Sequence, residues 1–396
     1  MPWTETCCMD ERVRFVTAAR TGWWSVSELC REYGISRKTG YKWLRRADAE
    51  GLSSLADRSR ARHSQEHRIP DDVRDALLKL RRRRPNRGPK KLLVELRRQL
   101  PDARLPSLSL ASEIIRQAGL AKPVKKRRRL KHGTGGLGGD DVPNGVWATD
   151  YKGQHRLKSK SYCYPLTVSD SCSRFLLACR AHRQISGMYS MLVFRNLFRT
   201  HGVPEHIRSD NGVPFASTGA GRLTDLSVFW IDQGIKLQRI TPGRPQQNGR
   251  HERIHRTLKE STLMPLAATL TAQQRRYDRF RDEYNFDRPS EALEMQCPGD
   301  VYEPSSRAYV EDPPDPEYPS EYLVRRVQKN GSIKLMGKRI FISECLRRRD
   351  VGLLEIDDGH WRVYYRHHPV GAVDTTAKNV RIRDMWDAGA TAPQAR

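Results

Sequence analysis

The sequence lacks an apolar run of the roughly 20 residues that a membrane-spanning helix requires. Its N-terminus, MPWTETCCMDER, also lacks the basic and then apolar order of an export signal. The eight cysteines are scattered and form no CxxC or His-Cys pair at zinc-binding spacing. We therefore expect a cytoplasmic protein with reduced cysteines, no structural zinc and no membrane partner.

Acidic residues are scarce relative to basic ones, with 46 Asp and Glu against 72 Lys and Arg, which gives a net charge of +26. Such a charge attracts polyanions, above all the phosphate backbone of nucleic acid. An acidic membrane surface is the alternative, but no amphipathic basic helix dominates and the charge is spread along the chain. DNA is therefore the expected partner, and the expected location is the nucleoid.

Residues 10 to 50 show the pattern of three helices. Ser25 and Glu28 have the spacing of a capping box, Ser36 can cap the next helix, and Gly51 closes it. Two short helices joined by a Gly-containing turn predict a helix-turn-helix whose second helix reads DNA. The apolar positions Tyr41 and Leu44 should leave its basic residues facing outward. The residues predicted to contact DNA there are Arg37, Lys38, Lys42 and Arg45. An ordinary basic helical hairpin would show the same pattern.

Residues 70 to 120 repeat the helical pattern with different residues, which fits a second DNA-binding unit and equally a plain three-helix bundle. From 145 to 290 strands come first and then alternate with helices, which predicts an α/β domain with a mixed central sheet. The strands are expected at 145–153, 162–182 (a pair turning near 169–173), 204–210 and 236–241, and the helices at 188–202, 223–234 and 248–262.

Short strand-like segments with Asn-Gly and Asp-Gly turns follow a proline-rich stretch and predict a small C-terminal β-barrel. The whole chain is therefore expected to be multidomain. The expected order is a helix-turn-helix domain (1–62), a second helical DNA-binding domain (63–121), a basic and Gly-rich linker (122–144), an α/β catalytic core (145–305), a Pro-rich linker (306–320), a small β-barrel (321–388) and a disordered tail (389–396).

Three acidic residues of the central region lie in distinctive settings. Asp150 belongs to WATDYKG, Asp210 ends a short strand in IRSDNGVPF, and Glu252 lies on a basic helix in TPGRPQQNGRHERIHRTLKE. Carboxylates from separate elements amid this much positive charge suggest a divalent-metal site that acts on phosphate. Two Mg²⁺ ions about 4 Å apart, with Mn²⁺ as a substitute, would stabilise the attacking and leaving oxygens of phosphoryl transfer. All three residues are thus predicted as catalytic metal ligands, with Asp150, at the expected centre of its strand, bridging the two ions.

Each acid alone also has an ordinary structural explanation. Asp-Asn-Gly is first of all a turn signal, so Asp210 can be purely structural. Asp150 can be an edge-strand charge, and Glu252 can pair with Arg256 one turn along the helix. The combination with the flanking residues is more specific than any single acid.

Those flanking sequences resemble the retroviral-integrase-type core of bacterial insertion-sequence transposases, the Asp-Asp-Glu recombinases. The resemblance rests on WATDYKG, on Asp-x-x-Ser-Arg at 170–174, on SDNG with Phe215, and on P-x-x-P-x-x-NG-x-x-ER-x-x-RTLK. It covers residues 140 to 305 closely. It implies an RNase H-like fold, Mg²⁺ dependence, cutting at transposon ends and strand transfer into target DNA. It places the three acids on the family's catalytic positions.

The same resemblance implies further DNA contacts around the helix of Glu252. The loop before it and the helix itself supply the residues Gln247, Asn248, Gly249, Arg256 and Lys259. As an alternative, Arg256 and Lys259 are simply solvated charges.

The sequence departs from the family pattern in three places. Ser290 replaces the usual His after Arg-Pro, the zinc-binding module of retroviral integrases is absent, and the interval from Asp210 to Glu252 is longer than is common. The segment GRLTDLSVFWIDQ accounts for the extra length, and Glu260 is the alternative third acid.

These features together predict a DNA transposase that binds element ends, hydrolyses the phosphodiester there, and joins the freed 3′-hydroxyl to target DNA as a homo-oligomer. The alternatives are a DNA-binding regulator with an inactive core and a metal-dependent nuclease without strand transfer.

Overall fold

The computed structural model describes residues 7–58, 69–122 and 137–383 and divides into two compact units, Met1–Arg68 and Ile69–Arg396. Most of the predicted basic linker and the predicted disordered tail lie outside the described residues. Within the described part of the chain, no helix combines the length and apolar character needed to cross a bilayer.

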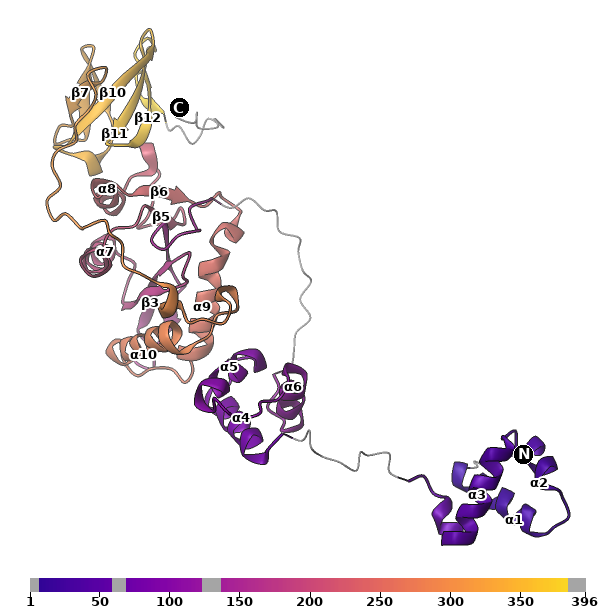
Figure 1. Cartoon of the computed structure of the whole chain (residues 1–396). Coiled ribbons are helices and arrows are strands. Elements are labelled where there is room, and N and C mark those ends of the chain that lie inside the picture. The colour runs from indigo at the N-terminus through magenta and orange to yellow at the C-terminus, as the bar shows by residue number, and fades with distance from the viewer. Residues whose placement is uncertain (1–6, 59–68, 123–136, 384–396) are drawn as a thin grey trace. The chain divides into compact units, whose positions relative to one another are not determined.

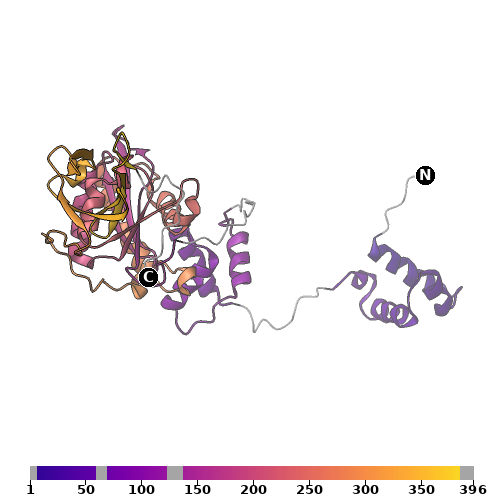
Figure 2. The ribbon, with the colours of Figure 1, turned by 90° about the horizontal axis from the view of Figure 1, so that it is seen from above.

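The first unit is a bundle of three helices followed by one 3-10 turn, and its helices lie together in both views (Figures 1 and 2). The elements are α1 (Cys8–Arg20), α2 (Val26–Glu32), α3 (Arg37–Glu50) and η1 (Leu52–Leu55). The capping box before α2 is present, because the Glu28 backbone N–H donates to Ser25 Oγ and the Ser25 N–H donates to Glu28 at 2.9 Å. Ser36 caps α3 by accepting from the Thr39 N–H at 3.2 Å. The predicted helix starts are therefore confirmed.

The inward face of α3 differs from the prediction. Trp43, Gly40 and Ala47 are buried against α1 and α2, whereas Tyr41 is 48% exposed and Leu44 only borders the core. The prediction that Tyr41 anchors this helix is therefore wrong. The buried face instead follows Gly40, whose missing side chain lets Phe15 and Cys30 approach the helix.

The second unit begins with another three-helix bundle around its own apolar core of Val, Leu, Ala and Ile side chains. Its helices are α4 (Asp71–Arg83), α5 (Pro89–Gln99) and α6 (Leu108–Gln117). Arg81 is almost fully buried and donates to the carbonyls of Arg87, at 2.7 Å, and Leu120, at 2.8 Å. Arg87 forms a buried ion pair with Glu95. Charged residues thus close the bundle at the end where α4 and α5 meet.

The central domain is built on a six-stranded mixed sheet in the order β2-β3-β1-β5-β6, and β4 also pairs with β3. Pairing is antiparallel for β1–β3 and β3–β4 and parallel for β1–β5 and β5–β6. The strands are β1 (Val146–Tyr151), β2 (His155–Arg156), β3 (Tyr162–Asp170), β4 (Leu176–His182), β5 (His206–Ser209) and β6 (Lys236–Arg239). The predicted mixed sheet is confirmed.

Helices cover both faces of this sheet, which explains why β3 reads as a nearly continuous buried run. One face packs on α7 and α8 through Phe194, Phe198 and Trp230. The other face packs on α9 and α10 through Ile254 and Tyr277. The helices are α7 (Gly187–His201), α8 (Asp225–Asp232), α9 (Gly249–Thr262) and α10 (Leu270–Asp282), followed by the short α11 (Pro298–Val301).

The C-terminal module consists of a five-stranded antiparallel sheet, in the order β13-β12-β11-β10-β7, and a separate β8–β9 hairpin. Among the described residues the five-stranded sheet is open, with β13 and β7 at its edges, so the closed barrel stays a prediction. The strands are β7 (Leu323–Arg326), β8 (Ser332–Leu335), β9 (Lys338–Phe341), β10 (Asp350–Asp357), β11 (His360–Tyr365), β12 (His368–Asp374) and β13 (Ile382–Arg383).

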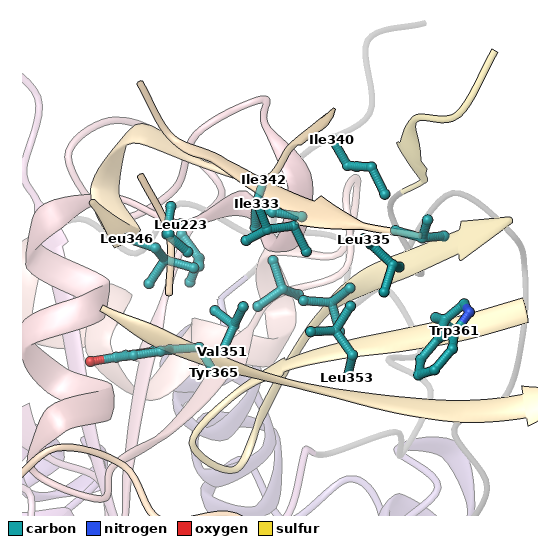
Figure 3. Packing of buried hydrophobic residues seen from close by; sticks show 14 of the residues in the cluster. Leu223, Ile333, Leu335, Ile340, Ile342, Leu346, Val351, Leu353, Trp361 and Tyr365 are labelled. Atoms are coloured by element: carbon teal, nitrogen blue, oxygen red, sulfur yellow. The ribbon is translucent and has the colours of Figure 1, made fainter. Parts of the chain in front are cut away.

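This module shares one hydrophobic core with the central domain. Leu223, Val228 and Ile231, which precede or belong to α8, pack in the same cluster as the inward side chains of β8 to β12. Figure 3 shows Leu223 beside Leu346 within that cluster. The segment between β5 and β6 is therefore the surface on which the C-terminal module rests.

Candidate active site

Two of the predicted acids lie at the same end of the central sheet. Asp150 is the fifth of six residues in β1, close to its carboxyl end and not at its centre as predicted. Asp210 directly follows β5, which runs parallel to β1. Because the carboxyl ends of neighbouring parallel strands meet at one edge of a sheet, the strand order brings these two side chains to one place.

Asp210 is also a turn residue, as Asp-Asn-Gly predicts. Its Oδ1 accepts a hydrogen bond from the Gly212 N–H at 3.1 Å, and the Asn211 side chain donates to the Ile240 carbonyl at 2.7 Å. A side chain at position 212 would lie 3.2 Å from Asp210 Oδ2, so glycine leaves room for the carboxylate. The turn therefore fixes the direction in which Asp210 faces.

Glu252 lies in the first turn of α9 and is exposed. The buried face of that helix carries His251, Ile254 and His255, which pack against the sheet that holds Asp150. Glu252 therefore stands at the border between the sheet and solvent.

Electrostatics tie the three carboxylates together. Burial, followed by the negative charge of Asp210 and a smaller contribution from Glu252, raises the pKa of Asp150 to about 7 from its ordinary value of 3.8. Burial likewise raises the pKa of Asp210. None of the three acids forms an ion pair with a Lys or Arg of the described residues, although Lys152 is near enough to lower the pKa of Asp150. The site thus gathers carboxylates that Lys152 balances only in part.

Hard carboxylate oxygens without a cationic partner suit Mg²⁺ by their chemistry. In the described part of the chain, however, no three His, Cys, Asp or Glu side chains already converge closely enough to enclose one ion. The donor set therefore fits the metal, and Glu252, on an exposed helical turn, would have to move its side chain inward to join the other two carboxylates.

Glu260, the alternative third acid, lies elsewhere. Its backbone carbonyl accepts from Asn86 of the α4–α5 turn at 3.0 Å, and its charge acts on Arg288. It does not appear among the charges that raise the pKa of Asp150, whereas Glu252 does. The geometry therefore favours Glu252.

A chain of buried polar side chains lies directly beneath Asp150 and was not predicted. Thr167, opposite Asp150 in the β3–β1 pairing, lies 2.7 Å from His251 and 2.6 Å from His255. Ser169 Oγ lies 2.7 Å from His251 Nδ1, and His255 Nδ1 lies 3.6 Å from Asp150 Oδ2. The sequence signal that was missed is a pair of histidines four apart on the same helix as Glu252.

The predicted DNA-contact residues fall into two groups. The side chains of Arg37, Lys38, Lys42 and Arg45 are exposed on α3, and those of Arg256 and Lys259 are exposed on α9. The loop before α9 forms the 3-10 turn η3 (Pro245–Asn248), in which Gln247 accepts from the Thr241 N–H at 2.7 Å and Asn248 is 6% exposed. Gly249 is the first residue of α9. Gln247 and Asn248 are thus engaged within the fold.

A basic cavity of about 310 Å³ opens along the outer side of α9 and was also not predicted. One buried guanidinium nitrogen of Arg174, Nη1, has no hydrogen-bond partner there. Burial and the nearby Arg250 lower the pKa of Arg174, as expected for a buried cation beside another cation. The cationic residues that line the cavity are Lys91, Arg174, Arg250, Arg253, Arg256 and Arg288.

Comparison with protein families gives matches along most of the chain. Residues 140–245 and 233–298 match integrase core domains, residues 11–63 a helix-turn-helix domain, residues 39–114 a homeodomain-like domain, and residues 322–381 the C-terminal domain of IS481 family transposases. The resemblance predicted from the sequence is confirmed by these matches.

Among curated proteins, the insertion element IS476 uncharacterized 39.2 kDa protein of Xanthomonas euvesicatoria is 29% identical over 161 residues, which cover 38% of this chain and 43% of that protein. The Gag-Pol polyprotein of avian reticuloendotheliosis virus is 32% identical over 121 residues, or 30% of this chain and 10% of the polyprotein. The chain thus spans less than half the length of the curated relatives it matches.

Among solved structures, the HTLV-2 integrase catalytic core in complex with magnesium is 16% identical, with a TM-score of 0.30 over 40% of this chain and 97% of that one. The simian T-cell lymphotropic virus intasome in complex with a PP2A regulatory subunit is 15% identical, with a TM-score of 0.36 over 74% of this chain and 97% of that one.

Proposed function

We propose that this chain, an IS481 family transposase with an integrase core and an N-terminal helix-turn-helix domain, cuts DNA at the ends of an insertion sequence and joins those ends to target DNA. The observation that supports the proposal most strongly is the only partly balanced negative charge at the sheet edge. There, burial and the carboxylates of Asp210 and Glu252 raise the pKa of Asp150 to about 7. Strongly raised carboxylate pKa values cluster at catalytic and metal-binding sites, and phosphoryl transfer is the chemistry that the family matches favour.

Mg²⁺ is the proposed cofactor, and Mn²⁺ should substitute for it. Asp150, Asp210 and Glu252 would hold two such ions. When bound, such ions lower the pKa of water and stabilise both the attacking and the leaving oxygen of a phosphodiester. We further propose that the core has the RNase H-like fold, in agreement with the order of its antiparallel and parallel strands.

The reaction proceeds in two substitutions at phosphorus. Water attacks the phosphodiester at the element end, its proton is lost to solvent, and the leaving oxygen becomes the free 3′-hydroxyl. That hydroxyl then attacks a target phosphodiester, which forms the new strand junction and releases one target 3′-oxygen. No covalent link to the protein is required in either step.

The role of the basic residues is to orient the DNA. Arg253 and Arg256, next to Glu252 on α9, line the basic cavity and can hold phosphates beside the reacting strand. Arg37, Lys38, Lys42 and Arg45 of α3, in the segment that matches a helix-turn-helix domain, would read the element ends. Lys259 and the turn Gln247–Gly249 are further proposed contacts. Both ends must be held at once, so we propose a homo-oligomer on DNA.

A strand-transfer assay with oligonucleotides of the flanking ends and Mg²⁺ tests the proposal. We expect joined products from the wild type and from Glu260→Gln, and none from Glu252→Gln, because Glu252, unlike Glu260, contributes to the raised pKa of Asp150. Cleavage at the ends without joining would favour a metal-dependent nuclease. Tight binding of the ends without any cleavage, in Mg²⁺ or in Mn²⁺, would favour a DNA-binding regulator.

A further inference from the structure

The buried chain beneath Asp150 connects two elements of the proposed active site. It runs from Ser169 and Thr167 on β3 to His251 and His255 on α9, and it ends at the carboxylate of Asp150 on β1. The four members of the chain besides Asp150 are at most 3% exposed. Buried polar groups are costly unless each finds a partner, so the protons in this chain must be arranged consistently.

Counting donors and acceptors leaves one arrangement when Asp150 is ionised. A neutral imidazole carries one N–H and one acceptor nitrogen, and a hydroxyl carries one proton. An ionised Asp150 can only accept, so a hydrogen bond between it and His255 requires the proton of His255 on Nδ1 and leaves Nε2 as an acceptor. Thr167 therefore donates to His255, in preference to the Asp150 carbonyl, because the nitrogen lies at 2.6 Å and the carbonyl at 3.2 Å.

The rest of the chain follows from that direction. With its hydroxyl proton committed to His255, Thr167 must accept from Nε2–H of His251, 2.7 Å away. His251 then accepts at Nδ1 from the hydroxyl of Ser169, also at 2.7 Å. Every donor thus points the same way, from Ser169 toward Asp150.

We propose that His255 is a positioning residue, which presents Nδ1–H to the carboxylate of Asp150 and thereby fixes the orientation of this ligand relative to α9. The proposal rests on the proposed function, since Asp150 and Glu252 must face the same ions. The separation of 3.6 Å is longer than a hydrogen bond, so the proposed bond requires the carboxylate of Asp150 to turn toward His255 when the site is occupied.

A purely structural role predicts something different. If the two histidines serve only to pack α9 on β3, then His251 matters at least as much as His255, since His251 is the more deeply buried and bonds to both Thr167 and Ser169. His251 does not contact Asp150, and His255 does. The two residues therefore form a matched pair, with the same helix, the same neighbour on β3 and a different relation to the metal ligand.

The test measures Mn²⁺ binding to the full chain by electron paramagnetic resonance, beside thermal unfolding. A glutamine amide imitates Nε2 of histidine and an asparagine amide imitates Nδ1. His255→Gln should thus keep the bond to Thr167 and lose the donor toward Asp150, and His255→Asn should do the reverse. We expect His255→Gln to weaken Mn²⁺ binding about 10- to 100-fold, as loss of a partner behind a metal ligand generally does. His255→Asn and His251→Gln should remain within about threefold of the wild type.

Thr167 supplies a second pair of variants should changes at His255 impair folding. Thr167→Val removes the hydroxyl that sets the direction of the chain and should weaken Mn²⁺ binding about tenfold, whereas Thr167→Ser retains the hydroxyl and should restore it. Equal losses of Mn²⁺ affinity in His255→Gln and His251→Gln, or losses of thermal stability alone, would overturn the proposal. If His255→Gln weakens Mn²⁺ binding as expected but the wild type joins no DNA, the proposed function fails and the positioning role stands.

Discussion

One buried carboxylate lies in the contact between the C-terminal module and the central domain, beside their shared hydrophobic core, and its removal makes a quantitative test. Asp232, the last residue of α8, accepts from Arg349 Nη1 at 2.6 Å, from the Tyr365 hydroxyl at 2.5 Å and from Arg366 Nε at 3.1 Å. Its side chain is 6% exposed, that of Arg366 is 19% exposed and that of Arg349 is 39% exposed. Asp232→Asn keeps the shape and removes the charge that both guanidinium groups face.

The expected loss follows from that burial. Removing one partner of a buried ion pair costs about 3 to 5 kcal/mol, because the other charge stays buried and unpaired. Arg349 is more than a third exposed, so water compensates much of its share, and we take the lower limit of about 3 kcal/mol. Since about 1.4 kcal/mol corresponds to a factor of ten, the population with the module detached should rise about 100-fold.

Hydrogen exchange of the backbone amides reports this population directly. We expect amides of β10 to β12 to exchange about 100-fold faster in Asp232→Asn, with the α4–α6 bundle unchanged. Asp315→Asn is the matched control, because its side chain is 77% exposed and meets Arg326 only at 3.9 Å. Unchanged exchange in β10 to β12, or an equal increase throughout the chain, would refute this account of the contact.

Two further predictions concern other parts of the chain. Gly40→Ala should lower the free energy of unfolding of the first unit by about 1 to 3 kcal/mol, despite the better helix propensity of alanine, because the new Cβ would lie 2.5 Å from Cys30 Sγ and 2.9 Å from Phe15 Cζ. A higher melting temperature, followed by tryptophan fluorescence, would contradict this. In metal-free protein, the raised pKa of Asp150 means that stability falls as pH rises from about 4 to about 7, since the folded state then holds a proton that the unfolded state has released. Asp210→Asn removes the second cause of that shift. Urea titration near pH 8 should therefore find this variant about 1 kcal/mol more stable than the wild type, although the variant joins no DNA. An unchanged dependence of the free energy of unfolding on pH would disprove the coupling between Asp150 and Asp210.

Many elements of the chain could be predicted from local patterns. Turn residues and caps are read from neighbours in the chain, so the Ser25–Glu28 box and the turn at Asp210 were found correctly. The helix expected at 188–202 is α7, although its apolar residue Met188 is 65% exposed.

Other features depend on contacts between distant residues and could not be predicted. The sequence of β12 does not predict a strand, because Pro369 and Gly371 interrupt the pattern. Its hydrogen-bonded pairing with β11, which the sequence does not show, stabilises the strand. His251 and His255 resemble ordinary helix residues until Thr167 comes to face them from β3.

The long interval between Asp210 and Glu252 has a mechanical consequence. The part of it around α8 supplies Leu223, Val228 and Ile231 to the core of the C-terminal module. That module is therefore packed against the central domain and is more than an appendage joined by a linker. A chain cut within the proline-rich stretch before β7 would leave this apolar wall bare to water. The shortened protein should therefore aggregate before its DNA binding can be measured. An isolated central domain needs the C-terminal module to stay soluble.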